Sequence, residues 1–336
     1  MNWLWVVVAV FPAITNGFTA VWLGAKFRNE TFANKEMNDH LLEICGHQKE
    51  SDVNEYPWAV SFVVDDVNRL GGSIISPYHI ITAAHGFMNT LGVGSKLCLS
   101  VSNSTVYKPI DVIRKTRLPG YGGKCIRGYS FTLPNHPRCH EADVQFNRIK
   151  SVLIDGDFSN NACQKGNDWA IVELENKIEF TDDIKPICLP APNRKIDGVL
   201  NVAGWGRSYI FNESGPMIHE IPMKIDLNCS RPWSDTLPNK ADDLICATSL
   251  DPKNYFAPRT CHGDSGSGME TRDAFGRATL LAMTSFGTRG CPANMLARFT
   301  RIDTHLFEIC KYTGVCYSLR KKKELDWKQV DSDTSS

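Results

Sequence analysis

The segment Gly263-Asp264-Ser265-Gly266 restricts the folds open to this chain more than any other feature. A serine hydroxyl is a weak nucleophile on its own, and it needs an adjacent base together with backbone N–H groups that can bind an oxyanion. Glycines on both sides of Ser265 suit that need, because a side chain there would obstruct a tight turn and the approach of a reacting molecule. A candidate base lies far upstream, in Thr82-Ala83-Ala84-His85. The fold must therefore bring two distant segments to one site.

In these contexts His85 and Ser265 resemble the trypsin and chymotrypsin-like family of serine proteases. Asp168 fits the third member of the family's triad, because it precedes the alternating apolar run that ends at Leu174. Asp143 is its rival, and the apolar alternation favours Asp168. The chain order is therefore His, Asp, Ser, which is the order of chymotrypsin and not of subtilisin or the α/β-hydrolases.

Further segments match the family in the right order, so that the resemblance covers about residues 52–312. They are Pro57-Trp58-Ala59-Val60-Ser61, Gly71-Gly72-Ser73-Ile74-Ile75-Ser76, Lys185-Pro186-Ile187-Cys188-Leu189-Pro190, Ala203-Gly204-Trp205-Gly206 and Thr284-Ser285-Phe286-Gly287.

The resemblance implies an all-β fold of two six-stranded antiparallel barrels with the site in the cleft between them. Short β-type runs broken by Gly, Pro and Asn agree with that fold. We expect the first barrel over residues 52–185, the second over 200–302, and then a helix that starts at Asp303 or Thr304 and ends at Gly314. His85 and Asp168 lie about twice as far apart in sequence as in family members, so we expect an insertion, with residues 120–161 as surface loop.

The resemblance also implies a role for each site residue. His85 would take the proton of Ser265 and later give it to the leaving amine, while Asp168 would orient the imidazole. The backbone N–H groups of Gly263 and Ser265 would form the oxyanion hole.

The substrate pocket departs from the familiar types. Six positions before Ser265, where trypsin-like members carry an aspartate, stands Arg259, which disfavours trypsin-type specificity. Two interpretations remain open: Arg259 points into the pocket and selects Asp or Glu by a charge-assisted pair, or it swings to solvent and leaves a shallow apolar slot. The other pocket positions implied by the resemblance are Ser285, Phe286, Gly287 and Ala297, whose methyl group would narrow the entrance.

The chain contains 12 cysteines and no Cys-x-x-Cys pair, which indicates an oxidising compartment and no metal site. The family's bridge around the histidine is missing at both ends, where Leu70 and Gly86 stand. The resemblance implies three retained disulfides: Cys45 with Cys188, Cys229 with Cys246, and Cys261 with Cys291. Fifteen pairings stay open for Cys98, Cys125, Cys139, Cys163, Cys310 and Cys316, among which a bridge between Cys310 and Cys316 is plausible.

The ends of the chain predict export. Residues 1–17 resemble a cleaved signal peptide, although the uncharged stretch runs on to Lys26 and leaves an uncleaved membrane anchor as the alternative. Residues 18–51 are expected to be a propeptide-like segment, 52–316 the peptidase domain, and 317–336 a basic and polar tail. Four Asn-x-Ser/Thr sequons agree with export, at Asn29, Asn103, Asn212 and Asn228.

Activation is where the resemblance is weakest. Family zymogens are cut after Arg or Lys, so that a new Ile or Val amino terminus can pair with the aspartate before the nucleophile, here Asp264. The corresponding segment, Ile44-Cys45-Gly46-His47, follows Glu43. Two interpretations remain open. In the first, an activating protease that accepts Glu cuts after Glu43. In the second, Cys45 is the propeptide cysteine, the activation cleavage site is deleted, and Asp264 lacks its usual cation.

Two functional hypotheses follow. The first is a secreted serine endopeptidase that works without a cofactor, as a monomer, on protein or peptide substrates and under the control of protease inhibitors. The second is a catalytically silent homologue that acts as a binding or regulatory protein. An esterase or lipase is disfavoured, because those enzymes place the histidine last. The formal net charge of +0 gives no reason to expect nucleic acid, and no membrane partner is expected for the mature chain.

Overall fold

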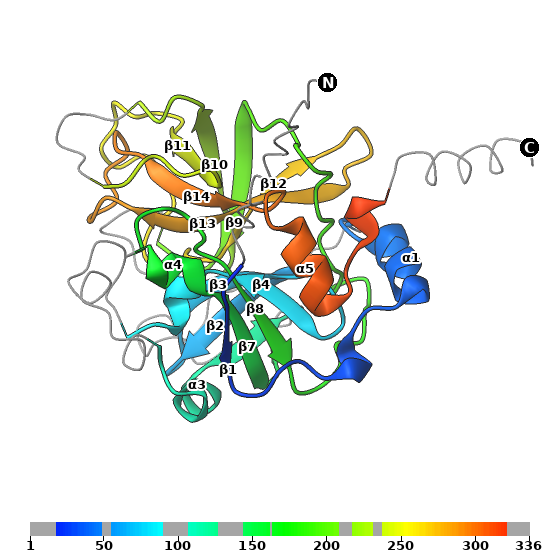
Figure 1. The fold of residues 1–336 in the computed structure, drawn as a ribbon. Helices are drawn as coiled ribbons and strands as arrows, with labels where there is room; N and C mark the ends of the chain where they lie inside the picture. The colour runs from blue at the N-terminus through cyan, green and yellow to red at the C-terminus, as the bar shows by residue number, and fades with distance from the viewer. Residues whose placement is uncertain are drawn as a thin grey trace, which may run out of the picture.

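Two β-sheets form the body of the molecule, and the helices lie around and beside them (Figure 1). A computed structural model of the chain describes residues 18–48, 55–89, 107–126, 144–161, 163–207, 217–230 and 237–320. The expected signal peptide, Cys98, Cys139, Asp143 and the sequons at Asn103 and Asn212 lie outside the described residues, as does the tail beyond residue 320.

The first sheet is antiparallel and contains eight strands in the order β1-β7-β8-β4-β3-β2-β5-β6. Its strands are β1 (Ala20–Leu23), β2 (Ala59–Val64), β3 (Val67–Ile74), β4 (His79–Thr82), β5 (Leu118–Tyr121), β6 (Gln145–Phe146), β7 (Ile149–Asp155) and β8 (Ala170–Leu174). Six of them are the expected barrel strands, and β1 and β6 are additions at the two edges. Three short helical segments accompany this sheet: η2 (Ala84–Phe87), α3 (Ile110–Thr116) and α4 (Gly156–Asn160).

The second sheet is the expected closed six-stranded barrel, in the order β10-β11-β14-β13-β12-β9. Its strands are β9 (Val199–Gly204), β10 (His219–Asp226), β11 (Leu244–Ser249), β12 (Gly268–Arg272), β13 (Ala278–Gly287) and β14 (Ala297–Arg301). Side chains alternate between the interior and the surface along β10, as is typical of a strand with one solvated face. The all-β prediction and one of the two predicted six-stranded barrels are confirmed. The eight-stranded first sheet is consistent with the other barrel, but the described strands do not close it.

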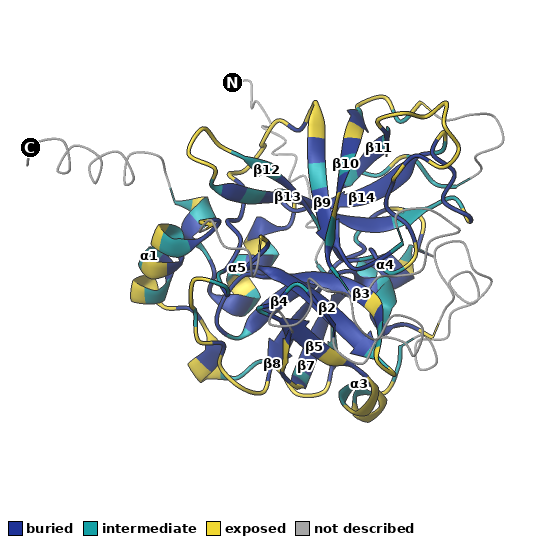
Figure 2. Cartoon of the chain, turned by 180° about the vertical axis from the view of Figure 1, so that it is seen from behind, coloured by how far each residue is buried: buried dark blue, intermediate teal, exposed yellow. Residues whose placement is uncertain are grey.

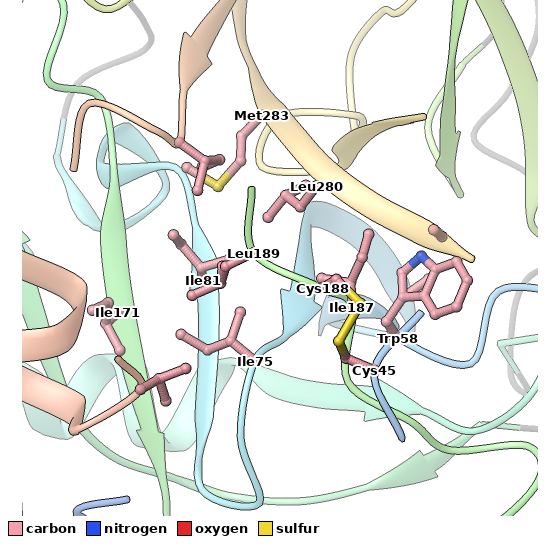
Figure 3. Close-up of a cluster of buried hydrophobic side chains, with 14 of the residues drawn as sticks. Cys45, Trp58, Ile75, Ile81, Ile171, Ile187, Cys188, Leu189, Leu280 and Met283 are labelled. Carbon is pink, nitrogen blue, oxygen red and sulfur yellow. A yellow bond between two sulfur atoms is a disulfide. The ribbon is translucent and has the colours of Figure 1, made fainter. Parts of the chain in front are cut away.

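Side chains from both sheets share one hydrophobic core. Ile81 and Ile171 of the first sheet and Leu280 and Met283 of the second belong to the same buried cluster (Figure 3). Buried residues are concentrated in the strands, whereas α3 presents an exposed outer face (Figure 2). Because burial of apolar area is the main favourable term in folding, this shared core fixes the two sheets against each other.

The segment that precedes the first barrel is built into the fold. It contains β1, η1 (Asn29–Thr31) and α1 (Lys35–Ile44), and β1 pairs with the edge of β7. The Arg28 guanidinium lies 3.1 Å from Glu173, whose side chain is fully buried on β8. Arg28 donates from its backbone N–H to the same carboxylate, and Thr31 donates its hydroxyl. The sequence analysis expected a propeptide-like segment and did not foresee these contacts.

The C-terminal helix α5 (Leu306–Thr313) ends at Gly314, whose φ of 74° is the left-handed conformation that glycine favours. The predicted start is wrong, because His305 is the N-cap residue and Asp303 instead bonds Arg301. The buried Asn38 of α1 donates to the Gly314 carbonyl and accepts from the N–H groups of Cys316 and Tyr317. Beyond η3 (Tyr317–Leu319), Arg320 pairs with Asp39 of α1, so packed structure extends to residue 320.

Residues 120–161 are not all surface loop, and that prediction is wrong for their second half. Residues 149–155 form β7, a strand with a buried apolar run, and residues 156–160 form α4. The glycines and prolines of the first half led to a loop prediction for the whole segment. The second half contains the buried apolar residues Ile149, Val152, Leu153 and Ile154, which form a strand.

Four disulfides join described residues. Three are the bridges implied by the resemblance: Cys45–Cys188, Cys229–Cys246 and Cys261–Cys291. The fourth is Cys310–Cys316, and Cys125 and Cys163 are also disulfide-bonded. Where the histidine bridge is missing, the Leu70 side chain packs directly against Gly86. Cys45–Cys188 lies beside Trp58 and ties the N-terminal segment to the connection between the sheets (Figure 3).

None of the helices in the described ranges has the length and apolar character needed to cross a membrane.

The Arg28–Glu173 contact predicts that a substitution in the N-terminal segment lowers the stability of the first sheet. Arg28→Met should lower the free energy of unfolding by about 3 kcal/mol, because it leaves a buried carboxylate without its cation. Denaturant unfolding with the disulfides intact measures this, and Lys35→Met on exposed α1 is the control, with an expected change within about 0.5 kcal/mol. Equal stabilities of the two variants would contradict the prediction.

Candidate active site

His85 and Asp168 are brought together by the pairing of two neighbouring strands. Thr82, the last residue of β4, pairs with Ala170, the first residue of β8. His85 follows Thr82 and Asp168 precedes Ala170, so both lie beyond the same end of the sheet. The His85 Nδ1 atom lies 2.7 Å from Asp168 Oδ2, and the His85 backbone N–H donates to Oδ1 at 2.9 Å.

The Asp168 carboxylate is almost wholly buried and receives contacts from both sheets. Ser285 of β13 donates its hydroxyl to Oδ2, and Thr300 of β14 donates to the Asp168 backbone carbonyl at 3.3 Å. Burial alone would raise the pKa of Asp168, but the His85 ring, Ser285 and the His85 N–H together hold that pKa below its usual value. Asp168 is therefore an ionised hydrogen-bond acceptor that fixes the imidazole by Nδ1.

Ser265 lies on the loop before β12 and is held against the first sheet through its backbone. Its carbonyl accepts the Gly71 N–H at 2.6 Å, and the N–H of the next residue, Gly266, donates to Thr284 at 2.7 Å. Gly266 has a φ of 79°, and a Cβ there would collide with Thr82 three residues before His85. The glycine is required because the nucleophile loop approaches the His85 segment so closely. Ser265 and His85 are both partly exposed.

Gly263 also has a left-handed conformation, with a φ of 95°. Its carbonyl accepts a hydrogen bond from the Asn68 amide at 2.9 Å, and Asn68 accepts one from the Ser61 hydroxyl at 2.8 Å. These contacts fix the Gly263–Asp264 peptide from the first sheet. The sequence analysis missed both Asn68 and Ser61, because nothing local distinguishes them from other strand residues.

Asp264 is fully buried beneath the nucleophile loop. One carboxylate oxygen accepts the Gly206 N–H at 2.9 Å and the other accepts the Cys261 N–H at 3.0 Å. Burial raises the pKa of Asp264 to about 7, against the opposing effects of those two N–H groups and of the Arg259 charge. Within the described part of the chain, no cation forms an ion pair with it.

Arg259 lies inside the protein and is only 2% exposed, so the interpretation in which it swings to solvent is wrong. Its Nε donates to Thr260, and its Nη1 donates to the backbone carbonyls of Pro292 and Met295 at 3.2 and 3.1 Å. A Cβ on Gly287 would collide with Arg259 Nη2, so the guanidinium lies against Gly287. Three carbonyl acceptors hold the cation there in place of solvent.

The remaining expected pocket residues lie on two paired strands. Gly287 at the end of β13 pairs with Ala297 at the start of β14. Phe286 is partly buried, and the buried Arg298 guanidinium lies over its ring at 5.7 Å. Ser285 points instead to Asp168, as described above, and so supports that carboxylate.

In the described ranges, one group of three side chains has metal-ligand atoms close together: Cys261, His262 and Cys291. The two sulfur atoms are joined in a disulfide, which leaves no thiolate for a metal.

Comparison with protein families agrees with this geometry. The model described as Trypsin matches residues 123–306, which is more than half of the chain. A second model, described as the nematode trypsin-6-like family, matches residues 17–106 and so includes the N-terminal segment with β1 and α1. The chain belongs to the trypsin family of serine proteases.

Several curated proteins resemble the chain at low identity. CLIP domain-containing serine protease B8 of Anopheles gambiae is 28% identical over 309 residues, which are 83% of this chain and 68% of that protein. Trypsin-like protease try-5 of Caenorhabditis elegans is 27% identical over 69% of this chain and 73% of its own. The proclotting enzyme of Tachypleus tridentatus is 23% identical over 83% of this chain and 71% of its own.

The Asp264 carboxyl predicts a pH-dependent stability. A carboxyl with a raised folded pKa favours the folded state while protonated, so its contribution is full below pH 3.8 and is lost as the pH rises through about 7. Compared with Asp264→Asn, the wild-type protein should therefore lose unfolding free energy between pH 4 and pH 7. Denaturant unfolding across this range measures the difference in unfolding free energy between the two proteins. Asp155 and Glu270 also have raised pKa values, but their contributions are the same in both proteins and cancel. Parallel curves for the two proteins would contradict it.

Proposed function

We propose that the chain is a secreted serine endopeptidase that cleaves peptide bonds through His85, Asp168 and Ser265. The observation that carries the proposal is the buried Asp168 carboxylate, which is ionised, bonds His85 Nδ1 and is held by Ser285. A carboxylate in this position would orient the imidazole and stabilise the charged form that it takes during a reaction.

The proposed mechanism gives each of these residues one step. His85 Nε2 takes the proton of Ser265 as its oxygen attacks the peptide carbonyl, and Asp168 stabilises the imidazolium. The developing oxyanion is bound by the N–H groups of Gly263 and Ser265. His85 then gives its proton to the leaving amine, and water releases the acyl group by the reverse steps.

We propose further that the chain acts without a cut after Glu43. Ile44 ends α1, Cys45 is bonded to Cys188, and Gly46 exchanges backbone hydrogen bonds with Pro186 and Ala278. A cut would leave the new amino terminus held beside these bonds, while Asp264 already has two N–H donors. These contacts favour the interpretation in which Cys45 is a propeptide-type cysteine and the junction is deleted.

The disulfides and the trypsin-family membership support an extracellular location. On the same grounds we propose protein or peptide substrates, control by protease inhibitors and a monomeric state.

One observation favours the second hypothesis, a silent homologue. Asp264 forms no ion pair within the described residues, so its direct hydrogen-bond donors are the neutral N–H groups of Gly206 and Cys261. The contacts of Asn68 and Gly71 with this loop oppose that hypothesis, because they hold its backbone from the other sheet.

Cleavage assays distinguish the two hypotheses. On a peptide library, Ser265→Ala should abolish cleavage, and Asp168→Asn should lower kcat by roughly 10⁴-fold through the wrong imidazole tautomer. Asp197→Asn, an exposed acid, should leave kcat unchanged. Cleavage that survives in Ser265→Ala comes from another enzyme, and its absence in the wild-type protein would favour the silent homologue.

Arg259 determines which residue can precede the scissile bond. Its guanidinium lies at the pocket wall against Gly287, so it repels Lys and Arg and takes space from large apolar side chains. We therefore propose that the pocket accepts short side chains before the scissile bond. Among charged side chains it should accept Asp and Glu more readily than Lys and Arg.

Removal of the guanidinium should enlarge this pocket. Arg259→Ser should raise the ratio of kcat/KM for Phe over Ala before the scissile bond about 10-fold or more, because burial of a Phe side chain stabilises by about 1.5–3 kcal/mol. Lys224→Ser on the outer face of β10 is the control. An unchanged preference would show that Arg259 does not select the residue.

A further inference from the structure

Three cations without a carboxylate partner lie beside the His85 segment. Arg69 is exposed, Lys108 is half-buried, and Arg117 is only 8% exposed. Among the residues that the structure describes, none of the three forms an ion pair. Such uncompensated positive charge is unusual next to a reaction site and suggests a place for an anion.

The backbone places Arg69 and Arg117 on the two sides of β2. Phe62 pairs with Leu70 and Val63 with Asn68, so Arg69 is the extra residue of a β-bulge, a device that redirects a side chain. Val63 also pairs with Leu118, and Arg117 immediately precedes Leu118. Two strand spacings of roughly 4.8 Å each separate the backbones of the two arginines.

Arg117 and Lys108 are attached to the turn that carries His85. The Arg117 guanidinium lies over the ring of Phe87 at 5.7 Å, and its Nε is buried without a hydrogen-bond partner. Lys108 donates from Nζ to the Met88 carbonyl at 2.6 Å, and its backbone N–H donates to Phe87 at 2.9 Å. A buried N–H without an acceptor costs free energy that an anionic ligand would recover.

The three charges oppose one another. Burial lowers the pKa of Arg117, and the charge of Arg69 lowers it further. Burial likewise lowers the pKa of Lys108 to about 8, with a contribution from Arg117. No carboxylate of the described residues raises either pKa, so an acidic group brought between the two cations would be attracted by both.

The direction of the proposed reaction assigns this cluster to one end of the substrate. The acyl side lies toward Gly287 and Arg259, on the second barrel. The leaving amine must lie at His85, because His85 gives it a proton. Residues after the scissile bond therefore pass over the His85 turn and past Arg69, whose neighbour Asn68 holds Gly263.

We propose that Arg69, Lys108 and Arg117 form a subsite for Asp or Glu side chains that follow the scissile bond. This proposal rests on the proposed endopeptidase activity. A carboxylate there would accept from the exposed Arg69 and would also be attracted by the nearby charges of Arg117 and Lys108. The preference for acidic residues should weaken as salt screens the pairs.

Acyl transfer tests the subsite separately from the pocket. A short peptide ester with a simple alcohol as its leaving group first acylates Ser265 without occupying the proposed subsite. A dipeptide amide then competes with water as the nucleophile that attacks this acyl-enzyme. The amine attacks the acyl ester, the C–N bond forms as the C–O bond to Ser265 breaks, and the amine proton passes through His85 to Ser265. Matched dipeptide amides with Glu or Gln in either position serve as nucleophiles.

We expect Glu to be preferred over Gln about 5- to 30-fold, the factor that 1–2 kcal/mol represents. Arg69→Gln, an exposed position that should not affect folding, and Lys108→Gln should each reduce this ratio several-fold. Arg194→Gln is the control, because Arg194 is exposed in the segment that connects β8 to β9, and it should leave this ratio unchanged.

The subsite is overturned if the ester is turned over but Glu and Gln compete equally. It is also overturned if the Glu preference survives in Arg69→Gln and Lys108→Gln, or if these variants change only the binding of a sulfated polysaccharide. Absence of any Ser265-dependent ester turnover contradicts the proposed function itself, and the subsite with it.

Discussion

The buried Asp168 carboxylate is the constraint around which the two halves of this molecule are arranged. It accepts from the ring and backbone of His85 in the first sheet, and Ser285 and Thr300 reach it from the second barrel. A buried charge is tolerated only where such donors surround it. The burial of Asp168 therefore requires both the observed position of His85 and the docking of the two sheets against each other.

The same docking positions the loop that contains Ser265. The Gly71 N–H holds the Ser265 carbonyl, and Asn68 holds that of Gly263, so the first sheet fixes the backbone of a loop that belongs to the second barrel. Asp264 supports this loop from below through the N–H groups of Gly206 and Cys261. The N-terminal segment adds β1 and the Arg28–Glu173 pair to the first sheet, and its Cys45–Cys188 disulfide lies beside β13 of the second barrel.

Sequence alone predicted the parts of this arrangement that local motifs carry. The two-sheet architecture, the helix end at Gly314 and the contact of His85 with Asp168 all follow from short segments with strong local chemistry. The contacts of Arg28 and Asn38 could not be predicted, because their partners lie far along the chain and no motif marks them. The orientation of Arg259 was open for another reason: its charge suits solvent, and only the carbonyls of Pro292 and Met295 make the interior position favourable. Strand β7 was missed because glycines and prolines before it dominated the pattern.

Catalysis by the uncut chain requires that the folded protein presents Ser265 as an activated nucleophile. Phosphonylation by an organophosphonate probe, followed by intact mass and peptide mapping, measures this most directly. We predict one phosphonyl group per molecule, located at Ser265, in protein whose chain is uncut between residues 43 and 53. Folded protein with intact disulfides that is labelled no faster than Ser265→Ala would contradict the account.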